Sequence, residues 1–91
     1  MTFRGDGLEA PRMHQLTVYV RHGCHLCTEM VQELEYLKSE FDFRYFLRDV
    51  DADPGLTQKY GDRVPVLAAG AEELCWYFLD EQCLREYFLT R

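Results

Sequence analysis

Two cysteines in the stretch Gly23-Cys24-His25-Leu26-Cys27 stand where an apolar strand gives way to an amphipathic helix. Residues 15–21 alternate apolar and polar side chains, which predicts the strand, and apolar residues at helical spacing predict a helix over 25–40. Backbone N–H groups and the helix dipole stabilise an anion at a helix N-terminus, so they favour a thiolate at Cys24. Cysteines in such motifs have pKa values of roughly 3.5–7.5, against about 8.5 for a free thiol. We therefore expect Cys24 to be a reactive nucleophile.

Cys27 follows one helical turn after Cys24, on the same side of the predicted helix. We expect the two thiols to close a disulfide and to open it again. A second interpretation is a zinc half-site, because His22 and His25 add two soft or borderline donors within the same six residues. The sequence offers no second cluster of ligands, so it favours thiol–disulfide exchange and predicts no metal.

The length and charge of the chain exclude several classes of function. Its 91 residues suffice for one domain with a single core, and sixteen acidic against ten basic residues give a net charge of −6. Binding of nucleic acid needs clustered Lys and Arg, which the sequence lacks. No apolar run approaches the roughly 18 residues of a membrane span, and the first residues have no signal-peptide core. We expect a monomeric cytoplasmic protein with neither nucleic acid nor membrane as a partner.

The chain is predicted to be one α/β domain over 14–91, preceded by a flexible tail over 1–13. Its elements follow the order β-α-β-α-β-β-α. We expect them at 15–21, 25–40, 43–48, 54–60, 64–69, 73–77 and 81–89. Asp53 and Asp80 are N-cap residues for the second and third helices. The first two strands flank a helix, so a right-handed crossover makes them parallel, whereas the turn at Gly70 makes the last two antiparallel.

Other conspicuous residues have structural interpretations. Cys75 lies in the middle of a predicted strand and is expected to be a small core residue, while Cys83 is expected to pack inward with Tyr87. Trp76 is expected in the core or on the sheet surface. The acidic run at 49–53 is expected to be a solvated loop that ends in an N-cap.

Three features of the chain resemble the thioredoxin superfamily and, more closely, the short glutaredoxin-like proteins of bacteria. They are the two cysteines after the first strand, the pair Val64-Pro65 before the third, and the element order over 14–90. The resemblance implies a thioredoxin-like (glutaredoxin-like) fold, in which a mixed four-stranded sheet carries helices on both faces. Pro65 fits the start or edge of a strand, because it cannot donate a ladder hydrogen bond.

The resemblance also implies a role for each site residue. Cys24 is the nucleophile that attacks a disulfide, and Cys27 resolves the resulting mixed disulfide. Val64 and a cis Pro65 lie against the cysteines and pair with an extended substrate or with glutathione. Arg21 occupies the position of the basic residue that glutaredoxins place three residues before the nucleophile.

The implied activity is that of a thiol–disulfide oxidoreductase. Its substrates are protein disulfides or glutathione mixed disulfides, and glutathione can serve as co-substrate. A glutathione or thioredoxin-type reductase system restores the dithiol, and no bound cofactor is needed. The alternative is a module of the same fold that binds a metal or docks a partner without redox turnover.

The chain departs from the glutaredoxin pattern at several positions. Arg63 replaces the usual threonine before Val-Pro, and His25 begins the pair between the cysteines, where Pro-Tyr is common. The glycine turn that holds the γ-glutamyl end of glutathione is replaced by bulky residues at 77–80, which argues against close approach of that ligand to the backbone. For His25 two interpretations stay open: a partly protonated imidazole that stabilises the Cys24 thiolate, or an exposed turn residue.

Overall fold

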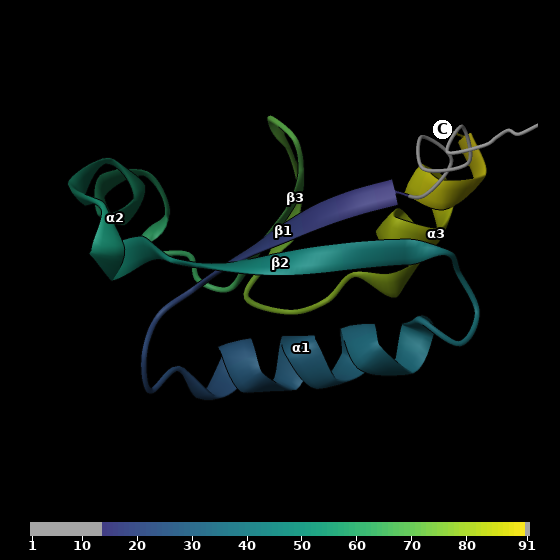
Figure 1. Cartoon of the computed structure of the whole chain (residues 1–91), viewed down its shortest axis with the longest axis horizontal. Helices are drawn as coiled ribbons and strands as arrows, with labels where there is room; N and C mark the ends of the chain where they lie inside the picture. The colour runs from purple at the N-terminus through teal and green to yellow at the C-terminus, as the bar shows by residue number, and fades with distance from the viewer. Residues whose placement is uncertain (1–13, 91) are drawn as a thin grey trace, which may run out of the picture.

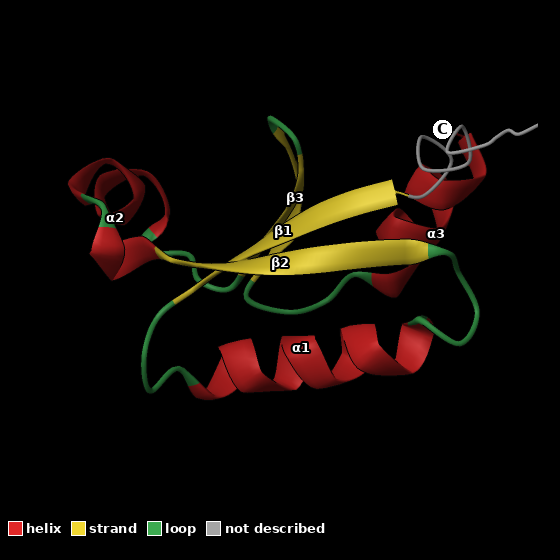
Figure 2. Cartoon of the chain, viewed as in Figure 1, coloured by secondary structure: helices red, strands yellow, loops and turns green. Residues whose placement is uncertain are grey.

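The computed structural model describes residues 14–90, so the predicted tail at 1–13 lies outside the described residues. The elements follow the predicted order, with one additional 3₁₀ helix (Figures 1 and 2). They are β1 (His14–Val20), α1 (His25–Leu37), β2 (Phe43–Asp49), η2 (Val50–Ala52), α2 (Pro54–Tyr60), β3 (Val66–Ala69), β4 (Glu72–Trp76) and α3 (Glu81–Thr90). Among these, no helix is long and apolar enough to cross a membrane.

The four strands form one mixed sheet in the order β2-β1-β3-β4. Strands β1 and β2 are parallel, with His14 opposite Phe43 and Val20 opposite Asp49. Strand β3 runs antiparallel to both β1 and β4. The predicted sheet is confirmed: the α1 crossover makes its neighbours parallel, and the short turn at Gly70 makes β3 and β4 antiparallel.

The helices cover both faces of the sheet, as predicted. Figure 1 shows α1 running along the face of β1 and β2. The main core joins α1 and α3 to all four strands and comprises Leu16, Val18, Met30, Leu34, Leu37, Phe43, Leu67, Cys75 and Leu84. On the opposite face, Tyr60 of α2 packs with Val50 and Val66, and its ring stacks on Tyr19 at 4.0 Å between centroids. Successive side chains of a strand point to opposite faces, so β1 and β3 contribute to both cores.

Several element ends differ from the prediction. Helix α1 ends at Leu37 and not near Glu40, because the N–H of Glu40 bonds to the carbonyl of Leu37 at 2.9 Å in a tighter turn. Strand β3 begins at Val66, after Pro65, which lacks an N–H for the ladder. Tyr77 lies outside β4, because its φ of 69° is incompatible with a strand.

The N-caps and the interpretation of Cys75 are confirmed. Asp53 accepts a hydrogen bond from the N–H of Gly55 at 2.8 Å, and Asp80 accepts one from the N–H of Cys83 at 3.0 Å. Cys75 is buried in the main core, and burial raises the pKa of its thiol. Cys83 is half-buried and donates to the carbonyl of Leu74 at 3.3 Å.

Candidate active site

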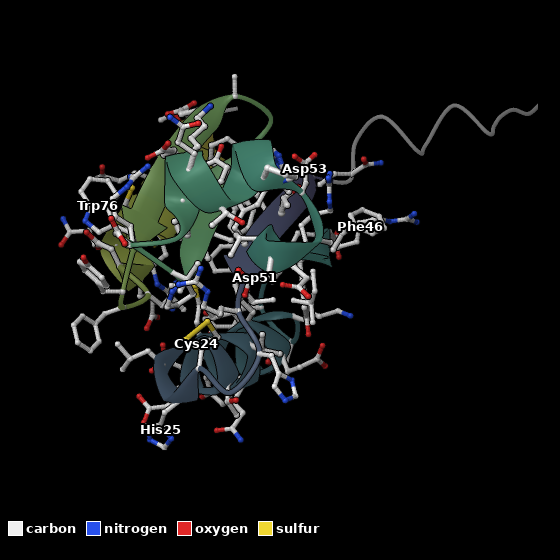
Figure 3. All side chains as sticks on the ribbon, turned by 90° about the vertical axis from the view of Figure 1, so that its left-hand side faces the viewer. Cys24, His25, Phe46, Asp51, Asp53 and Trp76 are labelled. Atoms are coloured by element: carbon white, nitrogen blue, oxygen red, sulfur yellow. A yellow bond between two sulfur atoms is a disulfide. The ribbon has the colours of Figure 1, made fainter. Side chains whose placement is uncertain are left out.

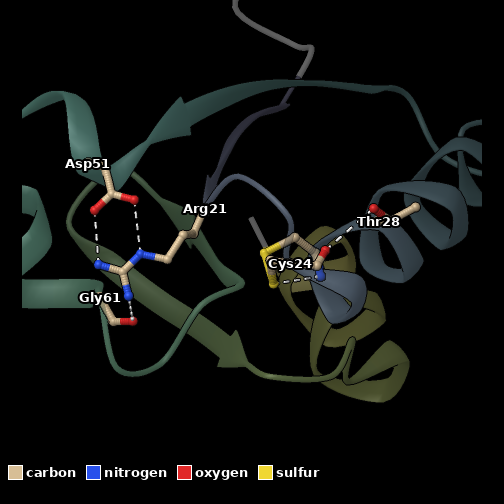
Figure 4. The surroundings of a disulfide bond; sticks show 6 residues. Arg21, Cys24, Thr28, Asp51 and Gly61 are labelled. Atoms are coloured by element: carbon tan, nitrogen blue, oxygen red, sulfur yellow. Dashed lines mark hydrogen bonds and ion pairs between the residues drawn. A yellow bond between two sulfur atoms is a disulfide. The ribbon is translucent and has the colours of Figure 1, made fainter.

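The two cysteines lie at the N-terminus of α1, at the end of the molecule that faces the viewer in Figure 3. A turn after β1 leads to Cys24, closed by a hydrogen bond from its N–H to the carbonyl of Arg21 at 3.2 Å. Gly23 has a φ of +76° in this turn, a conformation that glycine adopts without steric cost. Cys24 and Cys27 form a disulfide across 5.2 Å between Cα atoms (Figure 4).

The two sulfurs occupy different environments. Cys24 is the N-cap of α1, and its Sγ accepts a hydrogen bond from the N–H of Cys27 at 3.1 Å. Its carbonyl accepts from both the N–H and the hydroxyl of Thr28, at 3.2 and 3.4 Å. Cys24 is half-buried, whereas Cys27 is only 5% exposed. The outer sulfur is therefore the one that a macromolecular partner can reach.

A hollow of about 320 Å³ adjoins both cysteines on the side of β2. Its walls come from β1, the turn before α1, the first turns of α1 and the edge strand β2. They comprise Val20, Arg21, Gly23, Cys24, Cys27, Thr28, Val31, Gln32 and Leu47. The hollow gives room for a side chain next to the disulfide.

Arg21 lines this hollow, but its guanidinium is committed to internal partners (Figure 4). Its Nε and Nη2 donate to the two carboxylate oxygens of Asp51 at 3.0 and 2.9 Å, and its Nη1 donates to the carbonyl of Gly61 at 3.2 Å. The hydrogen bond from Arg21 lowers the pKa of the Asp51 carboxyl. The acidic run is thus more than a solvated loop, since Asp51 joins η2 to the end of β1. A substrate-binding role for Arg21 stays a prediction.

We expect Arg21→Gln to raise the pKa of Asp51 toward the ordinary value of about 3.9, because the charged donor is lost. Because folding lowers the pKa of Asp51, the Arg21–Asp51 pair stabilises the folded state at pH values above the unfolded-state pKa of Asp51. This stability is lost as the pH falls through the folded-state pKa. Carboxyl ¹³C NMR measures the titration. Arg48→Gln is the control, since no ion pair joins Arg48 to another residue in 14–90; equal Asp51 pKa values in both variants would contradict the assignment.

Val64 and Pro65 lie in the segment between α2 and β3. Their peptide bond is cis, Pro65 is buried and Val64 is half-buried. The carbonyl of Pro65 accepts a hydrogen bond from the N–H of Tyr77 at 2.8 Å, and the hydroxyl of Tyr77 donates to the carbonyl of Asp62 at 2.9 Å. These bonds fasten the segment to the residues that follow β4. The contacts of Val64 and Pro65 with a substrate stay predictions.

Arg63, the departure from the glutaredoxin pattern, is also committed to internal partners. Its Nη1 donates to Glu73 at 2.6 Å, its Nη2 donates to the carbonyl of Lys59 at 3.0 Å, and the guanidinium lies 5.4 Å from the Trp76 ring. The hydrogen bond from Arg63 lowers the pKa of Glu73. Trp76 lies on the sheet surface, one of the two predicted locations.

His25 points away from the disulfide (Figure 3). Its side chain is 83% exposed, and its Nε2 lies 2.8 Å from a carboxylate oxygen of Glu29. This position is that of an exposed first-turn residue, and an effect of the imidazole on Cys24 stays a prediction.

The zinc interpretation finds no support in the described part of the chain. Within residues 14–90, no three side chains of His, Cys, Asp or Glu form a group that could hold a metal ion. Two of the donors that suggested a zinc site, Cys24 and Cys27, form a disulfide. The other two, His22 and His25, are exposed.

The sequence interpretation missed the partners that fix the arginines beside the site. Asp51 is 30 positions from Arg21, and Glu73 is ten from Arg63. No local pattern connects such pairs, since only the tertiary fold brings them together.

Comparisons with known proteins agree with this geometry. Residues 15–89 match the family described as Glutaredoxin-like domain (DUF836). Uncharacterized protein Rv0508 from Mycobacterium tuberculosis is 34% identical over 76 residues, 78% of each chain. The solution NMR structure of protein Ne2328 from Nitrosomonas europaea is 36% identical, covers 96% of this chain and 98% of its own, and has a TM-score of 0.69. The X-ray structure of protein XcR50 from X. campestris is 32% identical, covers 84% and 97%, and has a TM-score of 0.59. The chain therefore belongs to the glutaredoxin-like (DUF836) family and has the α/β thioredoxin-like fold.

Proposed function

We propose that the protein is a thiol–disulfide oxidoreductase in which Cys24 is the nucleophile and Cys27 the resolving thiol. The position of Cys24 carries the proposal: this half-buried residue is the N-cap of α1, and its Sγ accepts a hydrogen bond from the N–H of Cys27 at 3.1 Å. In the reduced state, that N–H and the positive end of the helix dipole favour a thiolate, which is the reactive form of cysteine.

The reaction proceeds by two exchanges of sulfur. The Cys24 thiolate bonds to one sulfur of the substrate disulfide, whose S–S bond breaks, and the departing thiolate takes a proton from water. The Cys27 thiolate then bonds to Cys24 Sγ and releases the second substrate sulfur. Two electrons pass from the dithiol to the substrate, and Cys24 and Cys27 are left as the disulfide.

An external thiol must return these two electrons. Glutathione or a thioredoxin-type protein does so by the same exchange in reverse, so the protein needs no bound cofactor. We place it in the cytoplasm, because a reducing thiol pool is kept there. We also propose that it acts as a monomer. Its substrates are protein disulfides or mixed disulfides with glutathione.

A redox titration tests the proposal. The protein is equilibrated in glutathione buffers of set potential and alkylated, and free thiols at Cys24 and Cys27 are counted by mass. We expect one reversible two-electron transition between about −270 and −120 mV, the range of related dithiol proteins. The variant Cys24→Ser is the control and should lack this transition while Cys83 still reacts.

Two outcomes would argue against redox turnover. A pair that stays reduced at every potential, or that oxidises only when the protein unfolds, would leave no working couple. Purification with about one zinc or copper ion per chain, lost in Cys24→Ser, would instead favour the metal-binding alternative.

A further inference from the structure

A groove begins at the first turn of α1 and follows this helix, which supplies acidic side chains to one of its walls. Figure 1 shows the yellow-green segment between β4 and α3 running alongside this helix. Between them lie two hollows of about 60 and 280 Å³, which share Glu33 and Leu79 as lining residues. We call the two hollows together the α1 groove. Its near part is lined by Leu26, Glu29, Glu33, Tyr77, Phe78 and Leu79, and its far part also by Tyr36 and Glu81. Leu26 belongs to the first turn of α1, the same turn that holds Cys27, so the groove begins within one helical turn of the disulfide.

The groove exposes large apolar side chains. Phe78 is 67% exposed, and Tyr77 and Tyr36 are exposed at its wall and far end. Tyr77 holds this wall in place through its N–H bond to the carbonyl of Pro65 and its hydroxyl bond to the carbonyl of Asp62. An apolar side chain of a partner would bury surface against Phe78, which would favour docking.

The formal charges in the groove are negative. Glu29, Glu33 and Glu81 line it, and no lysine or arginine is among the described lining residues. Glu81 is paired with Arg85 at 2.7 Å, and Glu29 contacts His25. For Glu33, no ion pair with another residue in 14–90 is found. Its carboxylate is therefore available to a cation of a partner.

The arginines that stand before Cys24 and before Val64-Pro65 in the sequence are not available in the same way. Arg21 is bonded to Asp51 and Gly61, and Arg63 is bonded to Glu73 and to the carbonyl of Lys59. A glutathionyl group carries two carboxylates, which need cationic or N–H donors in a binding site. Both arginines would have to break internal bonds to receive them.

We propose that the α1 groove docks an extended polypeptide segment that carries Lys or Arg and an apolar side chain next to its disulfide cysteine. The preferred substrates are then basic protein disulfides and not glutathione mixed disulfides. From Leu26 to Tyr36 the helix rises about 15 Å, which an extended chain spans in about four to five residues. The recognised side chains lie within that distance of the substrate cysteine. This proposal rests on the proposed oxidoreductase function.

The test compares three mixed disulfides. Two of them contain peptides of equal length, joined to the disulfide through their single cysteine. These peptides differ only in having two Lys or two Glu within five residues of that cysteine. The third substrate is a glutathione mixed disulfide. We expect the highest kcat/KM for the Lys peptide and the lowest for the Glu peptide. The ratio between these two should fall as salt is raised, because the interaction is electrostatic.

Glu33→Lys should lower the ratio of kcat/KM for the Lys peptide over the Glu peptide about tenfold, because attraction becomes repulsion at one site. Glu86→Lys makes the same change of charge on the exposed side of α3, outside the groove, and should leave the ratio near that of the wild type. Both side chains are exposed, so both variants should fold.

The outcomes separate this proposal from the proposed function. If the wild type reduces all three substrates but prefers the glutathione or Glu form, or if Glu33→Lys and Glu86→Lys shift the ratio equally, the groove is not the docking site. If no substrate is reduced and Cys24 and Cys27 keep their thiol count, the oxidoreductase function itself is wrong.

Discussion

Cys24→Ser is expected to abolish disulfide reduction, with a loss in rate on the order of 10³-fold or more. Serine has the same shape but forms no S–S bond, so neither the mixed disulfide nor the protein disulfide can arise. The hydrogen bond from the N–H of Cys27, which now ends on Cys24 Sγ, would end on a hydroxyl. The rate of thiol release from a peptide mixed disulfide measures the effect.

Cys83→Ser is the matched control for this experiment. Cys83 is a half-buried cysteine on α3 whose thiol donates to the carbonyl of Leu74, a bond that a hydroxyl also makes. We expect this variant to keep the wild-type rate. A Cys24→Ser protein as active as Cys83→Ser would show that another group performs the attack.

Cys27→Ser separates the two exchange steps. Cys24 still attacks, but no thiol resolves the product, so the mixed disulfide should accumulate and be detected by mass. The partner of this intermediate identifies the substrate. Full activity of Cys27→Ser on a glutathionylated peptide would contradict the dithiol mechanism, because only a single-cysteine route would then remain.

The element order could be predicted because each signal is local. The alternation at 15–21 and the helical spacing after Cys24 need no knowledge of the rest of the chain. Asp53 followed by proline marks the start of α2, and the structure shows that carboxylate bonded to the N–H of Gly55. Local signals of this kind determine which elements exist and in what order.

Element ends were less predictable because they depend on competing hydrogen bonds. Apolar spacing continues past Leu37 to Phe41, yet the backbone tightens after Leu37 and the helix stops there. Tyr77 has a strand-forming side chain, but it adopts a φ of 69° while its N–H bonds to the carbonyl of Pro65. Tertiary contacts override the local preference at both positions.

The same distinction applies to the candidate site. The Cys24–Cys27 disulfide lies within one helical turn, so its spacing alone predicts it. The commitment of Arg21 to Asp51 depends on how η2 packs against the end of β1, which no sequence pattern reveals. The α1 groove likewise forms only because the residues after β4 lie along the helix.

Leu34→Ala is expected to lower the free energy of unfolding by about 2–5 kcal/mol, the range for large-to-small changes in a packed core. Leu34 is fully buried on the inner face of α1, within the main core shared with α3 and the sheet. Removing three carbons loses transfer free energy and leaves a cavity that its neighbours fill only in part. Urea denaturation followed by circular dichroism measures the change in midpoint at constant slope.

Leu89→Ala is the control, because it makes the same change on α3 at a side chain that is 79% exposed. We expect it to alter the free energy of unfolding by less than about 0.5 kcal/mol. Equal losses in the two variants would mean that α1 is not packed as the structure shows. The comparison bears on function, since α1 presents Cys24 at its N-terminus and the groove along its side. A small domain is stable by only about 5–15 kcal/mol. If Leu34→Ala removes several kcal/mol of this free energy, the positions of Cys24 and of the α1 groove should also become less fixed.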